Sequence, residues 1–195
     1  MFRYMDPGQY RNYVGISMAD GREKAVRYDL EAIKKSLTEH GMTPELMAGE
    51  NPMGIHSEAV FHHGKGSIRI YEQVLRELVL ALSEAGLEGS FEDMMDLHIA
   101  HEFYHCLEYW NGEDISRTCP TVRYRFLGVI PRMGAVRRTR EIGAHMFAKE
   151  VCRLVIHPKL LDYLLLERKD EEEAGAYFKE CMEWSERWKE LRGVV

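Results

Sequence analysis

The sequence predicts an α+β fold: a mostly helical single domain with a small β-sheet packed on one central helix. Apolar residues recur at helical spacing over most of the chain, whereas two short β-prone runs flank a glycine-rich turn. The length of 195 residues fits one compact domain. We expect an irregular N-terminal arm over residues 1–20, a core that carries the candidate site over 54–157, and C-terminal helices over 158–195.

The N-terminal third is expected to contain one helix between two irregular stretches. Residues 1–20 mix tyrosine and glycine without a period, which predicts the irregular arm. From residue 22 to 40 the apolar residues follow helical spacing, and Gly41 ends the pattern. The Gly- and Pro-rich stretch 41–52 then predicts a loop.

A hairpin and two helices are expected next. The runs Ile55–Phe61 and Ser67–Tyr71 are β-prone and flank a short turn, which indicates a hairpin. Gln73 to Ala85 carries an apolar stripe that ends at Gly86, so it predicts a helix. A further helix is predicted to begin at Ser90, where Asp93 follows in capping-box spacing.

The C-terminal half is expected to begin with a loop and to continue as helices. Residues 111–131 show no clear period, which is typical of a loop that borders a cleft. Residues 135–157 follow a helical pattern that Pro158 closes. One or two helices are expected over 160–195, with an interruption near the acidic run 170–173.

Composition argues against several classes of protein. The net charge is −6 and the sequence pI is near 5.9, which disfavours general nucleic-acid binding. No run approaches the roughly 18 apolar residues of a membrane span, so we expect no membrane partner. The N-terminus lacks the layout of a signal peptide, which predicts a cytoplasmic location. The cysteines show no CxxC spacing and are expected to stay reduced: Cys106, Cys119, Cys152 and Cys181.

The chemistry-bearing motif lies in the helix that begins at Ser90. His101-Glu102-Phe103-Tyr104-His105 is an HExxH sequence, and its i, i+4 spacing places both imidazoles on one face, where they can share one zinc ion. A catalytic zinc site takes three protein ligands and one open position for water. Glu102 stands beside the first ligand, where its carboxylate can act as the general base.

A third ligand must come from elsewhere, and two candidates lie on the predicted helix 135–157. Glu141 is favoured, because a carboxylate completes His₂Glu coordination and the small residues Gly143 and Ala144 beside it allow two helices to approach closely. His145, four residues further on, would instead make a three-histidine site.

Two other polar residues flank the motif. His98 could be a partner of a ligand, an alternate ligand or a polar residue at the edge of the helix, and we expect the last. Glu108 could orient His105 through a hydrogen bond, although we expect it to be exposed to solvent.

Together these residues resemble the zincin metallopeptidases whose third ligand is glutamate, the gluzincin type. The similarity is closest to the ImmA/IrrE-type peptidases, because an HExxH helix is followed by Arg-Glu-x-x-Ala-x-x-Phe-Ala, here residues 140–148, and it covers about residues 91–155. The resemblance implies that His101, His105 and Glu141 bind the zinc and that Glu102 is the base. His145 departs from the Asp or Asn that relatives carry.

The resemblance also implies a substrate and its placement. It implies a zinc-dependent peptidase for a peptide or protein substrate, held in extended form against an edge strand, for which Ser67–Tyr71 is the candidate. Donors to the transition state are often Tyr, His or Arg, and the local options are Arg123, Tyr124, Arg125 and His145. Two alternatives remain: a zincin-fold metal-binding protein that acts in regulation through protein contacts, and a peptidase blocked by its own arm 1–20.

Overall fold

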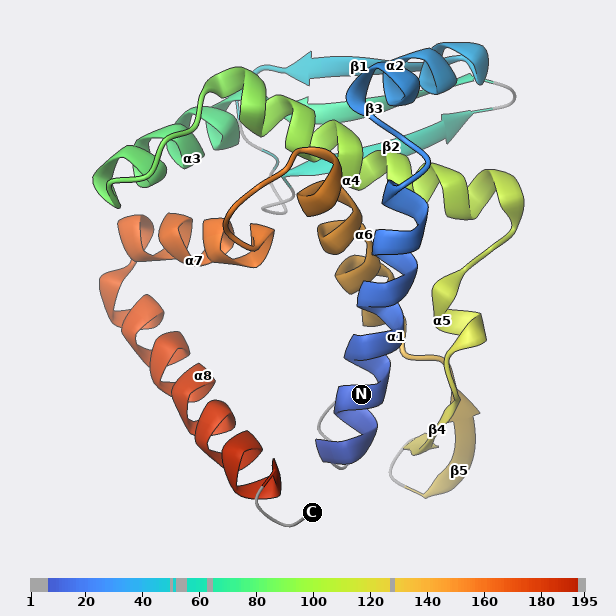
Figure 1. Ribbon diagram of the computed structural model, residues 1–195, viewed down its shortest axis with the longest axis vertical. Helices are drawn as coiled ribbons and strands as arrows, with labels where there is room; N and C mark the ends of the chain where they lie inside the picture. Colours follow the sequence, from blue (N-terminus) through green and yellow to red (C-terminus); the bar gives the residue numbers. More distant parts are fainter. Residues whose placement is uncertain (1–6, 50, 52–55, 63–64, 127–128, 193–195) are drawn as a thin grey trace.

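Helices carry most of the chain in the computed structural model, and strands form two small sheets (Figure 1). The α+β class and the mostly helical single domain expected from the sequence are therefore confirmed. No helix of the described residues has the length and apolar character to cross a membrane. The structure describes residues 7–49, 51, 56–62, 65–126 and 129–192.

Helix α4 (Phe91–Asn111) forms the middle layer of the molecule. It begins as predicted, because the Ser90 side chain accepts a hydrogen bond from the Asp93 backbone N–H while the Asp93 carboxylate accepts one from the Ser90 N–H. The sheet packs on one side of α4 and helix α6 (Arg138–Val151) on the other (Figure 1). Burial on both sides explains why apolar residues occur around most of its circumference.

The main sheet has the order β1-β3-β2. Strands β2 (Ser57–His62) and β3 (Lys65–Tyr71) form the predicted antiparallel hairpin, whereas β1 (Met42–Met47) pairs with β3 in parallel. The loop expected over 41–52 is thus partly a strand. Pro44 and Glu45 are unusual in strands, so the sequence there does not predict one. Proline is tolerated because β1 lies at an edge of the sheet.

The position of β3 corrects one expectation about substrate binding. Ser67–Tyr71 belongs to the central strand, paired on both sides, so it is no free edge. The edge strand that packs on α4 is β2. The order follows from burial, because Ile68 and Ile70 of β3 are fully enclosed in the main core.

The main core lies between the sheet and the helices around it. Helices α2 (Leu30–Glu39) and α4 pack against the sheet, and α2 and α3 (Glu72–Glu84) each pack against α4. Fully enclosed side chains include Ile33, Leu37, Ile68, Ile70, Leu75, Phe103, Tyr104 and Phe147. The helix predicted over Gln73 to Ala85 is confirmed by α3. The four cysteines form no disulfide, as expected.

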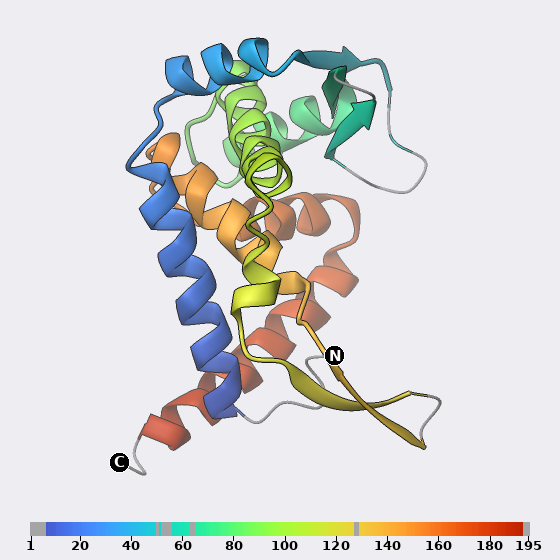
Figure 2. The ribbon, with the colours of Figure 1, turned by 90° about the vertical axis from the view of Figure 1, so that its right-hand side faces the viewer.

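The irregular arm predicted over residues 1–20 is wrong from residue 7 onward. Residues Pro7–Ala25 form helix α1, which packs along α6 (Figures 1 and 2). The buried residues of α1 are Tyr13, Ser17, Gly21, Lys24 and Ala25, of which only Tyr13 and Ala25 are hydrophobic, so the apolar signal at this helical spacing is weak. The predicted helix 22–40 is accordingly two helices, and Asp29 caps the second by accepting a hydrogen bond from the Ala32 N–H.

The loop expected over residues 111–131 is also wrong. It contains the short helix α5 (Ile115–Thr118) and a hairpin of β4 (Val122–Phe126) and β5 (Ile130–Gly134). Figure 2 shows this hairpin projecting from the helical body. Residues 122–126 do alternate apolar and charged side chains, which is a strand pattern, but only Val122 of them lies in a described core.

The C-terminal region was expected to hold one or two helices, and the structure has two. Helices α7 (Pro158–Lys169) and α8 (Glu171–Arg192) are separated at Asp170, close to the predicted interruption. The helix expected over 135–157 is shorter, since α6 ends at Val151, and Pro158 begins α7 instead of closing α6. Proline is well suited to the first turn of a helix, where its missing N–H costs nothing.

Candidate metal centre

Helix α4 presents the two histidines of the HExxH motif side by side. The rings of His101 and His105 lie one turn apart, with centroids 5.1 Å from each other. Their side chains are 17% and 15% exposed, so each reaches the surface of a cavity while most of the ring is enclosed. The placement follows from the i, i+4 spacing of the motif alone.

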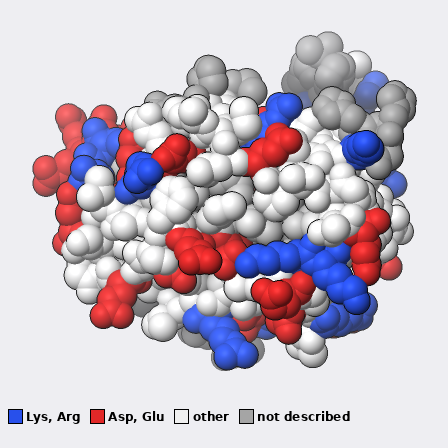
Figure 3. Space-filling view, turned by 90° about the horizontal axis from the view of Figure 1, so that it is seen from above, with Lys and Arg blue, Asp and Glu red and all other residues white. Residues whose placement is uncertain are grey.

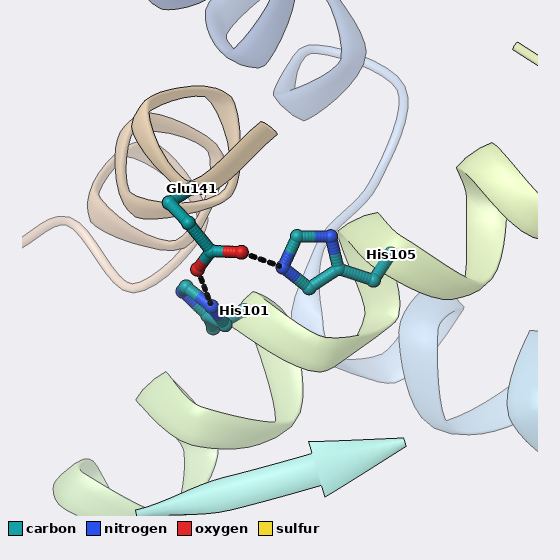
Figure 4. Close-up of side chains that lie close together, drawn as sticks. All are labelled: His101, His105 and Glu141. Carbon is teal, nitrogen blue, oxygen red and sulfur yellow. Dashed lines mark ion pairs between the residues drawn. The ribbon is translucent and has the colours of Figure 1, made fainter. Parts of the chain in front are cut away.

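Glu141 lies in the first turn of α6, and its carboxylate lies next to both rings (Figure 4). Its carboxylate oxygens lie 3.4 Å from His101 Nε2 and 3.5 Å from His105 Nε2. The approach of the two helices depends on Gly143, because a Cβ at that position would overlap the hydroxyl oxygen of Tyr104 and lie 2.7 Å from its ring carbon Cζ. The small residues noted in the sequence therefore stand where the helices come closest.

The three side chains fit a metal ion. Zinc binds nitrogen and oxygen ligands at about 2.0–2.1 Å in tetrahedral geometry, which separates neighbouring ligand atoms by about 3.4 Å. Each ring nitrogen lies close to this distance from one Glu141 oxygen, 3.4 Å from His101 to Oε2 and 3.5 Å from His105 to Oε1. Among the described residues, His101, His105 and Glu141 form the group whose ligand atoms converge within 4.8 Å. His145 is outside this group, although its ring centroid lies 4.8 Å from that of His101.

Glu102 lines the same cavity and is itself buried, with 6% of its surface exposed. One carboxylate oxygen accepts a hydrogen bond of 2.7 Å from the Ser57 hydroxyl. Ser57 is the first residue of β2, so the sheet holds the carboxylate in place. Sequence reasoning missed Ser57, because nothing in a strand of ordinary composition marks which residue will face a helix 45 positions away.

Glu108 is a buried partner of His105, and its expected exposure is wrong. It is 3% exposed and accepts hydrogen bonds from His105 Nδ1 at 3.2 Å and from Arg140 Nε at 2.7 Å. Its other oxygen accepts the backbone N–H of Ile115 at 3.1 Å. Because Nδ1 donates to Glu108, the Nε2 of His105 is left to face Glu141, as a metal ligand requires.

Charge around His105 favours a cation at this point. Burial lowers the pKa of His105, but the carboxylates of Glu108 and Glu141 outweigh burial and raise the pKa to about 9. The pKa of Glu141 lies far below its usual range, chiefly because of its contacts with His101 and His105. Two ring nitrogens and a carboxylate that converge in this way call for either a proton or a metal ion between them.

Of the other residues that the sequence suggested for this site, some line the cavity and some do not. His98 lines the cavity and is buried, with Nδ1 2.7 Å from the Met94 carbonyl oxygen, so it is no exposed edge residue. His145 also lines the cavity, and burial lowers its pKa to about 3. Arg123, Tyr124 and Arg125 lie on β4, outside the residues that line the cavity. Of the proposed donors, only His145 is therefore close to the centre.

The cavity is an open groove of about 630 Å³ between β2, α4, α6 and α7. The side chains of Phe61 and Tyr109 stack at 4.1 Å and form an aromatic wall, and Tyr109 is 64% exposed. Lys159 and Asp162 of α7 line the groove as well. Among the described residues of α1, none lines it, so this helix gives no support to the self-blocked alternative.

Comparison of the chain with family models, with curated proteins and with solved structures finds no match. The chemistry of this centre therefore has to be inferred from its own residues. Four of them carry that inference, since three donor atoms converge at ligand distance and a buried carboxylate shares their cavity.

Proposed function

We propose that the protein is a zinc-dependent peptidase that hydrolyses peptide bonds in a peptide or protein substrate. The convergence of His101, His105 and Glu141, with Glu102 in the same open groove, carries the proposal. The spacing of these residues in the sequence resembles that of gluzincin-type enzymes, and the groove beside them has a volume of about 630 Å³. A location in the cytoplasm belongs to the same proposal.

His101, His105 and Glu141 would hold one zinc ion. When bound, zinc supplies Lewis acidity, which polarises a substrate carbonyl and lowers the pKa of water. The protein would hold these ligands in fixed positions. Glu108 orients the ring of His105, and the close packing of α6 on α4 at Gly143 places Glu141 beside that ring. Glu141 is the most exposed of the three, with 55% of its side chain accessible, so the centre opens toward the groove.

Glu102 would move the proton in the reaction. As general base it accepts a proton from the attacking water and delivers this proton to the leaving amine. The hydrogen bond from Ser57 uses one carboxylate oxygen, and proton transfer requires only the other. Burial of Glu102 beside the groove keeps its carboxylate in one orientation, which lowers the entropic cost of the step.

Strand β2 is the best candidate for holding the substrate. It is the edge strand of the sheet next to α4, and Ser57, Glu58, Ala59 and Phe61 of this strand line the groove. An extended peptide could add to that edge through backbone hydrogen bonds, while its side chains meet Phe61 and Tyr109. We therefore expect extended peptides to be better substrates than folded proteins.

Metal analysis tests the ligand set before any substrate is known. Wild type, Glu141→Ala and His145→Ala are purified without added metal, reloaded with zinc, and measured by elemental analysis. About one zinc per chain is expected in wild type and in His145→Ala, and much less in Glu141→Ala. Retention of zinc by Glu141→Ala together with its loss from His145→Ala would move the third ligand to His145.

A peptidase screen then tests the reaction, with Glu102→Gln as the matched control. This variant keeps the size of the side chain and the zinc ligands but removes the base, so cleavage is expected to fall by about 10²–10⁴-fold at unchanged zinc content. Cleavage that Glu102→Gln leaves intact would exclude this mechanism. A zinc-loaded protein that cleaves no peptide in a library of extended peptides would favour the regulatory, protein-binding alternative.

A further inference from the structure

The β4–β5 hairpin is anchored at its base, and most of the residues whose burial is described in its two strands are exposed. Val122 and Val136, at its two ends, are buried in a small core with Tyr13, Ile115 and Cys119. From there the two strands project beyond the helices (Figure 2), and neither strand contributes to the groove of the metal centre. An element that is anchored at its base and whose strands contact chiefly each other is suited to contact a partner.

The segment that carries the hairpin concentrates positive charge. Residues 115–140 contain no Asp, Glu or Lys, but they contain seven arginines, so the remaining residues of this chain of net charge −6 carry −13. Arg117 and Arg140 lie in ion pairs with Asp114 and Glu108. The side chains of the other five are exposed: Arg123, Arg125, Arg132, Arg137 and Arg138. By contrast, acids and bases are interspersed on the face above the main sheet (Figure 3).

Apolar side chains lie among these arginines and also face water. Val129 is 73% exposed, Ile130 46% and Met133 60%. Met133 pairs with Arg123 across the strands, and side chains of such a pair share one face of the ribbon. Exposed apolar groups gathered on one projecting element are typical of an interaction surface.

We propose that this hairpin docks the protein on the surface of an anionic phospholipid bilayer. Arginine pairs well with phosphate through its planar guanidinium, and the headgroup layer supplies phosphates at high density. The apolar side chains of Val129 and Met133 would enter the boundary between headgroups and acyl chains, whereas Ile130, three residues before Met133, lies on the other face of the ribbon. A nucleic acid would satisfy the arginines as well, but it offers no apolar phase to the side chains beside them.

This inference differs from the expectation drawn from composition. The absence of a run long enough to span a bilayer predicts no membrane partner, and the negative net charge disfavours general binding to nucleic acids. A peripheral contact requires neither a spanning segment nor a positive net charge, because the surface potential acts within about one Debye length of the membrane. The distribution of charge along the chain matters here more than its sum.

Co-sedimentation with vesicles tests the proposal without any need for enzymatic activity. The full chain is mixed with vesicles of phosphatidylcholine alone or with phosphatidylglycerol added, at low and at high salt. We compare wild type with Arg123→Gln/Arg125→Gln and with Val129→Ser/Met133→Ser. The matched control is Arg27→Gln/Arg76→Gln, which removes the same charge from arginines that are 64% and 66% exposed outside the hairpin.

Wild type and the control variant are expected to bind vesicles that contain phosphatidylglycerol but not vesicles of phosphatidylcholine alone. This binding should weaken at high salt. The double arginine variant should bind about 30-fold more weakly, since each basic residue near the surface contributes about fivefold. The apolar variant should weaken binding about tenfold even at low salt. Absence of binding to anionic vesicles, or equal loss in the control, would overturn the proposal. So would binding of a DNA or RNA duplex through Arg123 and Arg125 in place of vesicles.

Discussion

The carboxylate of Glu108 accepts a hydrogen bond of 2.7 Å from Arg140 Nε, and this contact joins the two helices that carry the candidate ligands. Glu108 follows His105 by three residues on α4, and Arg140 directly precedes Glu141 on α6. The same carboxylate also holds His105 Nδ1. The pair thus sets the orientation of one ring and the position of the third ligand at once.

Glu108→Gln is expected to weaken zinc binding by about 10–100-fold, the usual cost of losing a partner of a histidine ligand. The substitution keeps the volume of the buried side chain but removes the charge that orients His105. Zinc affinity is measured by competition with a chromogenic chelator. The exposed Glu113→Gln serves as the control, and equal affinities in both variants would show that Glu108 plays no part in holding the ligand.

Ser57→Ala is expected to reduce peptide cleavage about tenfold while leaving zinc content unchanged. The hydroxyl of Ser57 donates to Glu102 at 2.7 Å, and without it the carboxylate samples unproductive orientations. The loss of one hydrogen bond should lower the free energy of unfolding by only about 1 kcal/mol. Cleavage is compared with that of Ser83→Ala, a change at an exposed position of α3; an unaltered rate in Ser57→Ala would argue against a positioning role.

Gly143→Ala is expected to destabilise the protein by about 1–3 kcal/mol and to lower its zinc affinity. The added Cβ would overlap Tyr104, which is fixed by its hydrogen bond of 2.6 Å to Asp20 of α1. Helix α6 would have to move away from α4, and Glu141 would move with it. Zinc affinity and the free energy of unfolding in urea report the two effects.

Gly15→Ala is the matched control for that substitution. Gly15 lies on α1, and nothing stands within 4 Å of the Cβ that alanine would add. Alanine favours the helix by about 0.5–1 kcal/mol over glycine, so this variant should be as stable as wild type or more stable. Destabilisation of both variants to the same extent would mean that the close approach of α4 and α6 is not the cause.

Acid is expected to destabilise the metal-free protein through His98. Burial lowers the pKa of His98 to about 4 from its ordinary value of 6.5. Between these values the unfolded chain binds the proton more readily, so the stability that is complete above pH 6.5 declines as the pH falls toward 4. The contribution of this one residue amounts to about 2 kcal/mol by pH 5.

Urea unfolding between pH 7.5 and pH 5 measures this dependence. His98→Gln, which cannot take up the proton, should show a shallower decline than wild type. The exposed His40→Gln should decline as wild type does. If His98→Gln loses stability as steeply as wild type, the acid sensitivity arises elsewhere, for instance at His56, whose pKa burial also lowers.

Local patterns in the sequence predicted several helices and strands, and they predicted that His101 and His105 lie side by side. The capping box at Ser90, the β2–β3 hairpin and α3 follow from spacing within a few residues. The juxtaposition of His101 and His105 also needs only the 3.6-residue period of one helix. Such features depend on neighbours in the chain, so a sequence can specify them without reference to the rest of the fold.

Other elements escaped prediction because their signal is not apolar. Helix α1 packs along α6, but its buried residues are Tyr13, Ser17, Gly21, Lys24 and Ala25, a mixed stripe that becomes recognisable only once the fold is known. Glu108 was expected at the surface because a lone carboxylate is costly to bury. Arg140 and the Ile115 N–H offset that cost, and both come from outside α4.

The sequence by itself determined that this chain is a mostly helical α+β domain with two histidines and a glutamate in HExxH spacing on one helix. Only the tertiary structure decided that Glu141 rather than His145 meets both rings, that Ser57 holds Glu102, and that β2 is the edge strand beside the groove. The physical reason is that helical periodicity is a local property, whereas a contact between α4 and α6 is set by how closely Gly143 and Tyr104 allow two helices to pack.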